Sequence, residues 1–135
     1  MGFFAHLHQL SDWALVALRL GVGAIFLVHG TQKRAMWKMS PSPQMPAPFL
    51  SLLKVLSIAE PLGALAVLTG LFTQLAAAGF CLDMLGAIRL KSAQMHKGFS
   101  GDGGWEFEFL LLVAALALVI TGAGRFALDR FLFGL

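Results

Sequence analysis

Residues 19–33 read RLGVGAIFLVHGTQK, an almost wholly apolar run that nevertheless contains Arg19, His29 and Lys33. With the apolar residues that begin at position 13, the run reaches the length of about 20 residues that an α-helix needs to cross a bilayer. An unpaired charge at the centre of such a helix costs roughly 2.5–3.5 kcal/mol. The stretch therefore predicts a membrane-spanning helix whose polar side chains face other helices and not the lipid.

The composition is that of a membrane protein. Of the 135 residues, 58% are hydrophobic and 13% are charged, and the mean hydropathy is +0.79, whereas a soluble domain has roughly 25% charged residues. The length predicts a single transmembrane domain, residues 1–135. A formal charge of +3 without a dense Lys/Arg run does not indicate nucleic-acid binding. The one cysteine, Cys81, excludes an internal disulfide and a Cys-x-x-Cys redox pair.

Four apolar segments are long enough to cross the membrane as helices, at about residues 13–33, 49–71, 73–95 and 105–123. We predict an all-α transmembrane four-helix bundle, in which the second and third spans form an antiparallel hairpin. Residues 3–10 are expected to add a short interfacial helix. Lysines and arginines concentrate in the loops after the first and third spans, so the positive-inside rule places these loops in the cytoplasm and both termini outside.

Three charged residues lie well inside the predicted spans: Arg19, Glu60 and Asp83. Glu60 and Asp83 lie near the middles of the two spans of the hairpin. Two facing carboxylates repel each other unless one is protonated or a cation lies between them. Arg19 is the obvious cation, so we expect an internal ion-pair network that holds the helices in register.

A second polar group lies toward one membrane face, because successive spans alternate in direction. Its members are His29, Lys33, Arg89, His96, Glu106 and Glu108. His29 and Lys33 share with Arg19 an arc of roughly 80° on their helix. Arg89 and His96 are seven residues apart, so they are expected to share a stripe of the third span. Glu106 and Glu108 point to opposite sides of theirs, so only one of them can face the bundle interior. Imidazoles, cations and a carboxylate at the mouth of an apolar bundle, beside a flexible glycine-rich loop, indicate a small-molecule or proton site.

Five motifs, in order along the chain, resemble those of the DoxX family of small bacterial membrane proteins. They read LRLGVGAIFLVHGTQK in the first span, AEPLGALAVLTGLFTQLAA across the second and third, then LDMLGAI, GGWEF and TGAGRFALDR. The resemblance implies a multi-pass four-helix bundle in the bacterial inner membrane. Its motif positions in this chain are Arg19, His29, Gly30, Lys33, Glu60, Asp83, His96, Trp105 and Glu106. The proline-rich loop and Glu108 look like local variation.

The resemblance also implies a function. The family is named after a thiosulfate:quinone oxidoreductase in which a related membrane subunit faces the quinone, and other members are associated with oxidative stress and with soluble redox enzymes. We therefore expect a membrane subunit of a quinone-linked redox complex, in which His29, His96 and Glu106 relay protons. The ligand-binding groups would be Arg19, Lys33, Glu60, Asp83, Arg89 and Trp105. The chain has no nucleotide fingerprint, haem attachment sequence or metal-ligand set, so it encodes no cofactor site and a partner redox protein would supply the electrons.

Two other classes of function stay open. A non-catalytic membrane anchor or assembly factor would use the buried charges only to hold the helices in register. A small-solute or proton transporter would use Arg19, Glu60 and Asp83 as a path, although four spans without a duplicated half offer little machinery for alternating access. A homodimer packed through small residues such as Gly79 and Gly86 would supply a second half.

Overall fold

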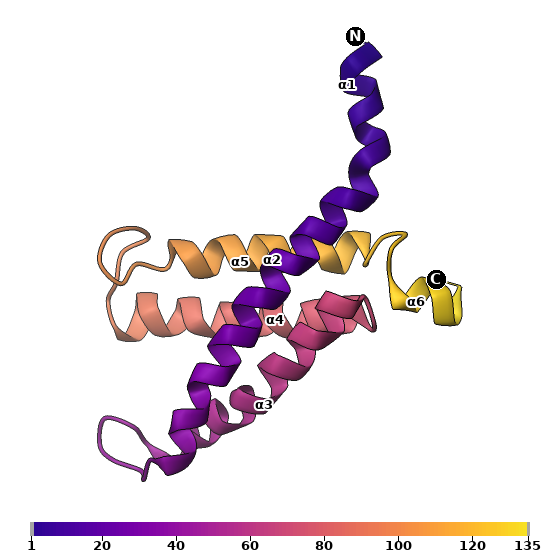
Figure 1. Cartoon of the computed structure of the whole chain (residues 1–135). Helices are drawn as coiled ribbons and strands as arrows, with labels where there is room; N and C mark the ends of the chain where they lie inside the picture. The colour runs from indigo at the N-terminus through magenta and orange to yellow at the C-terminus, as the bar shows by residue number, and fades with distance from the viewer. Residues whose placement is uncertain (1, 135) are drawn as a thin grey trace.

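The chain is all-helical, as predicted. The computed structural model describes residues 2–134, and no β-strand occurs among them (Figure 1). The helical elements are α1 (Gly2–Leu7), the 3₁₀ turn η1 (His8–Leu10), α2 (Ser11–Gln32), the 3₁₀ segment η2 (Lys33–Lys38), α3 (Ala47–Thr69), α4 (Thr73–Arg89), the π-helical turn η3 (Leu90–Gln94), α5 (Glu106–Thr121) and α6 (Leu128–Phe133).

Each predicted span contains one long helix, and the first span differs most from its predicted limits. The helical path that contains α2 begins at Gly2 and continues to Lys38. Residues 3–10 are helical, as predicted, in α1 and η1, which continue into α2 without a break. Their position at the membrane interface stays a prediction. In Figure 1, α1 projects well beyond the other helices.

Two helical stretches are long and apolar enough to cross a membrane, Gly2–Lys38 with 37 residues and Ala47–Thr69 with 23 residues. α4 and α5 are shorter, with 17 and 16 residues. At a rise of 1.5 Å per residue, α5 is about 24 Å long, less than the roughly 30 Å of a bilayer's hydrocarbon core. α4 continues directly into η3, so the helical path there reaches Gln94. That all four helices cross the membrane stays a prediction.

α2 and α3 pack closely because glycine removes the side chain at two contact points. A Cβ atom added to Gly23 would lie 2.5 Å from Leu68 Cγ, and one added to Gly30 would lie 2.3 Å from Pro61 Cδ. Both distances are far shorter than the separation of about 3.5–4.0 Å at which carbon atoms pack. The contact at Gly30 holds the His29 end of α2 against the middle of α3.

α4 and α5 form the second closely packed pair. Apolar side chains from α2, α3, α4 and α5 fill the space between the two pairs. At the centre, Phe26 of α2 stacks on Phe80 of α4, with ring centroids 3.7 Å apart and planes 3° from parallel. Buried alanines (Ala64, Ala77 and Ala115) allow the helices to approach around these rings.

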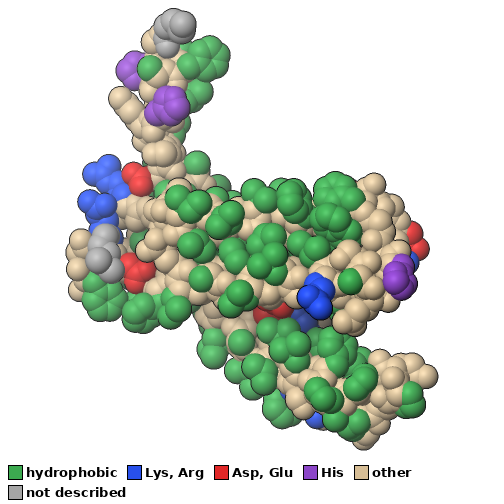
Figure 2. Space-filling model, turned by 180° about the vertical axis from the view of Figure 1, so that it is seen from behind, with side chains coloured by type: hydrophobic (Ala, Val, Ile, Leu, Met, Phe, Trp, Pro, Cys, Tyr) green, Lys and Arg blue, Asp and Glu red, His purple; other side chains and the backbone are tan. Residues whose placement is uncertain are grey.

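The two pairs diverge from the turn that joins α3 to α4. Figure 1 shows α3 and α4 meeting at this turn and separating toward their other ends. Figure 2 shows a face covered mainly by hydrophobic side chains, with charged groups at its ends and in the recess between the two parts of the molecule. The polar residues of the chain are thus divided between the closed end of the α3–α4 hairpin and its open end.

Candidate functional site

Arg19 lies at the closed end of the hairpin, where it binds backbone carbonyls. Its side chain is 4% exposed. It donates four hydrogen bonds, from Nε to Val67 O (2.9 Å), from Nη2 to Leu68 O (2.9 Å), and from Nη1 to Ala123 O (3.0 Å) and Phe126 O (2.7 Å). Val67 and Leu68 belong to the last turn of α3, where the helix dipole favours a cation. The expected pairing of Arg19 with Glu60 and Asp83 was wrong, because helix-end carbonyls satisfy the guanidinium instead.

The segment after α5 folds over this closed end. Asp129 of α6 accepts hydrogen bonds from the backbone N–H groups of Phe72 (2.8 Å) and Thr73 (3.3 Å), and so caps the start of α4. Gly70, at φ +75°, fits beneath it, since an added Cβ would lie 2.8 Å from both Arg19 Nη2 and Ala127 Cα. We call Arg19 and the carbonyls it binds the Arg19 clasp. The clasp holds three segments together and is structural.

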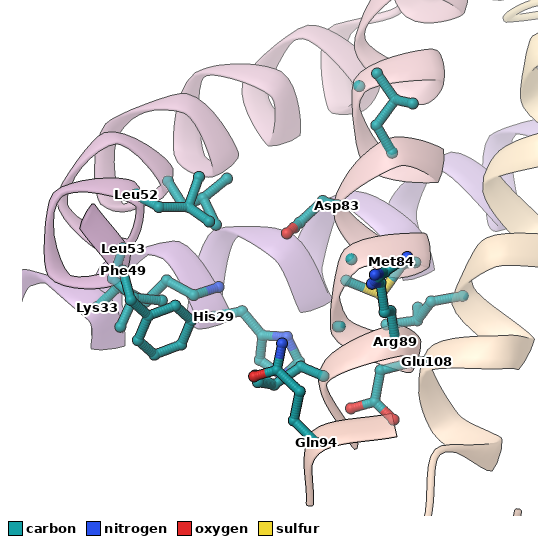
Figure 3. A pocket seen from close by; sticks show the side chains of 17 residues that line it. His29, Lys33, Phe49, Leu52, Leu53, Asp83, Met84, Arg89, Gln94 and Glu108 are labelled. Carbon is teal, nitrogen blue, oxygen red and sulfur yellow. The ribbon is translucent and has the colours of Figure 1, made fainter. Parts of the chain in front are cut away.

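A cavity of about 580 Å³ opens between α3 and α4 at the other end of the hairpin. Its volume lies within the range of roughly 300–1,000 Å³ that is typical of small-molecule sites. Most of the wall is apolar and comes from α3 and α4, with Phe49, Leu52, Leu53, Leu56, Leu82, Met84 and Leu90. The polar part of the lining consists of His29, Lys33, Asp83, Arg89, Gln94 and Glu108 (Figure 3). The cavity is therefore an apolar slot with a polar mouth.

At the polar mouth, His29 comes from the end of α2 and Lys33 is the first residue of η2. Both line the cavity, as their predicted position on one helical stripe implies. Lys33 forms a salt bridge with Glu60, whose side chain is 1% exposed. Figure 3 shows Lys33 and Asp83 directed into the same space, with His29 beside them. Lys33, and not Arg19, is the cation that accompanies the carboxylates of α3 and α4.

The structure distinguishes between the two glutamates at the start of α5. Glu108 lines the cavity and forms a salt bridge of 2.6 Å with Lys91, which also donates a hydrogen bond of 3.2 Å to Gly104 O. Glu106 is exposed and does not line the cavity. The sequence left open which glutamate faces inward, and the structure places Glu108 at the cavity and not Glu106, which was predicted as a proton-relay residue. Lys91, which could be taken for a surface lysine, ties the glycine-rich loop to α5.

His96 and Trp105 lie outside the cavity lining. His96 is exposed, and its backbone adopts φ +52°, so the chain turns away from the α4 stripe at this residue. Trp105 packs edge-on against Phe99 and Phe109, with ring centroids 4.8 and 6.3 Å away. The structure therefore brings together His29, Lys33, Glu60, Asp83 and Arg89, and leaves apart Arg19, His96, Trp105 and Glu106.

Gln94 is a cavity residue that the sequence reasoning missed. It lies in η3, the π-helical turn that follows Arg89 and is closed by a hydrogen bond of 3.0 Å from Met95 N to Leu90 O. An extra residue in one turn rotates the side chains that follow, so positions counted at 100° per residue from α4 are misplaced. π-helical turns occur often at functional sites, but residue spacing alone does not reveal them.

Glycines on α4 keep the cavity open. Gly79 and Gly86 both line it, and a Cβ atom added to either would meet no other atom within 4 Å. Their small size thus leaves space for an occupant. The homodimer contact expected at these residues stays a prediction. Within residues 2–134, no cluster of three or more His, Cys, Asp or Glu side chains is placed to hold a metal ion.

These features define a class: a small all-helical membrane protein with a lateral cavity and a charged mouth. The sequence model of the DoxX family matches residues 14–96, which contain most of α2, all of α3 and α4, and most of the mouth. The chain belongs to the DoxX family.

Relatives in several bacteria cover most of the chain. CatD of Bacillus subtilis, named as an oxidoreductase on a provisional basis, is 33% identical over 120 residues, or 86% of this chain and 84% of its own. The Mycobacterium tuberculosis protein Rv3486, described as a membrane protein, is 31% identical over 92% of this chain and 84% of its own. A Haemophilus influenzae protein is 28% identical over 95% of this chain and 97% of its own. No solved structure matches the chain.

Proposed function

We propose that the chain is a four-helix inner-membrane subunit of a quinone-linked redox system. The four-helix membrane arrangement is supported by the outer faces of α4 and α5, where Leu82 is 72% and Ile120 73% exposed. Apolar surface of this extent is stable in lipid and a liability in water. η2, η3 and the loops that follow carry Lys33, Arg34, Lys38, Lys91 and Lys97. The positive-inside rule then places the cavity mouth on the cytoplasmic side and both termini outside.

The apolar slot with its polar mouth is the observation that carries the proposal. A quinone has an apolar isoprenoid tail and a head with two carbonyl oxygens that accept hydrogen bonds. The tail would run between the leucines of α3 and α4 and leave sideways into the lipid. The head would lie at the mouth, where Lys33, Arg89 and Gln94 provide N–H donors.

Reduction of a quinone to a quinol consumes two electrons and two protons, and forms two O–H bonds. The electrons would come from a soluble redox protein docked on the basic cytoplasmic face. The protons would pass through the mouth, where His29 supplies a titratable imidazole and Glu108 a carboxylate in place of Glu106. The name of CatD, which is that of an oxidoreductase, agrees with a redox-associated role.

The test is whether lipid quinone copurifies with the protein, and whether its binding is lost when the cavity is filled. Gly86→Leu adds an apolar side chain to the lining of the cavity, and nothing lies within 4 Å of its Cβ atom. Leucine also has the higher helix propensity, by close to 1 kcal/mol, so folding should not suffer. We expect at least a tenfold loss of bound quinone, measured by extraction and chromatography.

Gly21→Leu is the matched control. Gly21 is an exposed α2 residue whose added Cβ also meets nothing within 4 Å, and it does not line the cavity. This variant should retain wild-type quinone. If the Gly86→Leu protein binds as much quinone as the wild type, or if the wild type binds none, the proposal is contradicted and a non-catalytic anchor is favoured.

A further inference from the structure

A second, smaller cavity, which we call the inner cavity, lies between α3 and α4, nearer than the first to the turn that joins these helices. It has a volume of about 160 Å³ and is lined by Glu60 from α3, Asp83 from α4 and apolar or small residues around them. At roughly 30 Å³ per molecule it has room for about five waters. Asp83 lines this inner cavity and also the larger one, so its carboxyl is shared by both.

Two carboxylate oxygens in this region have no hydrogen-bond donor among residues 2–134. Glu60 Oε1 accepts from Lys33, but the buried Oε2 has no partner, and Asp83 Oδ2 is likewise buried and unpartnered. An ionised carboxylate accepts hydrogen bonds and donates none. Leaving such a buried acceptor unsatisfied costs about 1–3 kcal/mol, and more when the group is charged. The two carboxyl groups of Glu60 and Asp83 therefore need a further hydrogen-bond donor.

The surrounding charges indicate what that donor is. Lys33, at the start of η2, offsets the charge of Glu60, and His29 of α2 faces the larger cavity. From α4, Arg89 lines the mouth. From α5, Glu108 is paired with Lys91 through Oε1, while its buried Oε2 has no partner in the described part of the chain. The Asp83 carboxylate has no salt-bridge partner within the described part of the chain. One positive charge is lacking at Asp83, and a single proton supplies both that charge and a donor.

We infer that Glu60 and Asp83 share one exchangeable proton across the inner cavity, and that Asp83 delivers it to the occupant of the larger cavity. The delivery step rests on the proposed function, whereas the shared proton does not. In that step the Asp83 O–H bond breaks and an O–H bond forms on the quinone oxygen, while the docked redox protein supplies the electrons. The carboxylate pair is then reprotonated from water at the cytoplasmic mouth.

The shared proton is tested by infrared spectroscopy of the purified, quinone-free protein at neutral pH. A protonated carboxyl group has a carbonyl stretch that a carboxylate lacks, and the band shifts in heavy water. We expect this band in the wild type and its loss in both Asp83→Asn and Glu60→Gln, because the remaining carboxylate then lies alone near Lys33. Glu106→Gln, which changes an exposed glutamate, should keep the band. A wild type without the band, or a band that survives both substitutions, would overturn the inference.

Delivery is tested separately with quinone-loaded protein and a chemical reductant. Asp83→Asn should keep its bound quinone but reduce it about 100-fold more slowly, within the range of roughly 10²–10⁴ for general acid catalysis. An unchanged rate would overturn delivery by Asp83. If the wild type binds no quinone, the proposed function fails, and the infrared band still decides whether the proton is shared.

Discussion

Replacing Arg19 by methionine should destabilise the protein strongly, because the clasp loses every hydrogen bond that the guanidinium makes. Arg19 donates four bonds to carbonyls of α3 and of the segment after α5. Hydrogen bonds to charged groups contribute about 1.5–3 kcal/mol each, so the gross loss is about 6–12 kcal/mol. Methionine avoids the roughly 2.5–3.5 kcal/mol that a buried arginine costs in a membrane helix.

Water at the end of the bundle can replace part of the remaining loss, so we expect a net destabilisation of about 3–5 kcal/mol, the range seen when a buried charge network loses one partner. At roughly 3–6 °C per kcal/mol for a chain of this size, Tm should fall by at least 10 °C. The assay is thermal unfolding in detergent, followed by circular dichroism.

Arg130→Met is the control, since Arg130 is an exposed arginine of α6. It should change stability by no more than about 0.5 kcal/mol. Arg19→Lys tests the geometry, because one ammonium cannot replace a planar guanidinium that binds four carbonyls on two segments, so it should rescue little. A Tm for Arg19→Met close to that of the wild type would refute the interpretation of the clasp.

Two further substitutions examine the closed end by the same unfolding assay. Gly70→Ala should lower the free energy of unfolding more than Gly101→Ala does. Both glycines have positive φ, but only at Gly70 does an added Cβ meet Arg19 and Ala127. Equal losses of stability would mean that the clasp can move aside. Asp129→Ala removes the cap of α4 and should lower the free energy of unfolding by about 1–2 kcal/mol. Asp102→Ala, in the exposed loop, should leave stability unchanged. If Asp129→Ala also leaves stability unchanged, α4 needs no cap from α6.

The helices were predictable, because long apolar runs have few other stable structures. The membrane class, the α3–α4 hairpin and the shared stripe of His29 and Lys33 all follow from segment length and from 100° per residue. The inward orientation of Arg19 followed from the cost of a charge in lipid. The hydrogen-bond partners of Arg19 could not be predicted. They are backbone carbonyls at the end of a helix and in a loop, and every residue has a carbonyl, so the sequence does not show which ones the side chain reaches.

At the mouth of the cavity, helical spacing of 100° per residue did not predict which side chains face inward. Glu106 and Glu108 were correctly predicted to point in different directions, but only the rotation of α5 against α4 decides which one meets Lys91. His96 was expected to follow the stripe of Arg89, seven residues earlier. The π-helical turn and the positive φ of His96 break that register.

The amino-acid sequence alone determined that this chain is helical, that it belongs in a membrane and that its few charges must avoid lipid, because those properties depend on local composition and on transfer free energy. Only the tertiary structure decided that Arg19 lies at the closed end of the α3–α4 hairpin while the other buried charges lie beside the cavity at its open end. That division depends on where α3 and α4 diverge, and the divergence is set by close contacts at Gly23, Gly30 and Phe26 between segments far apart in the chain.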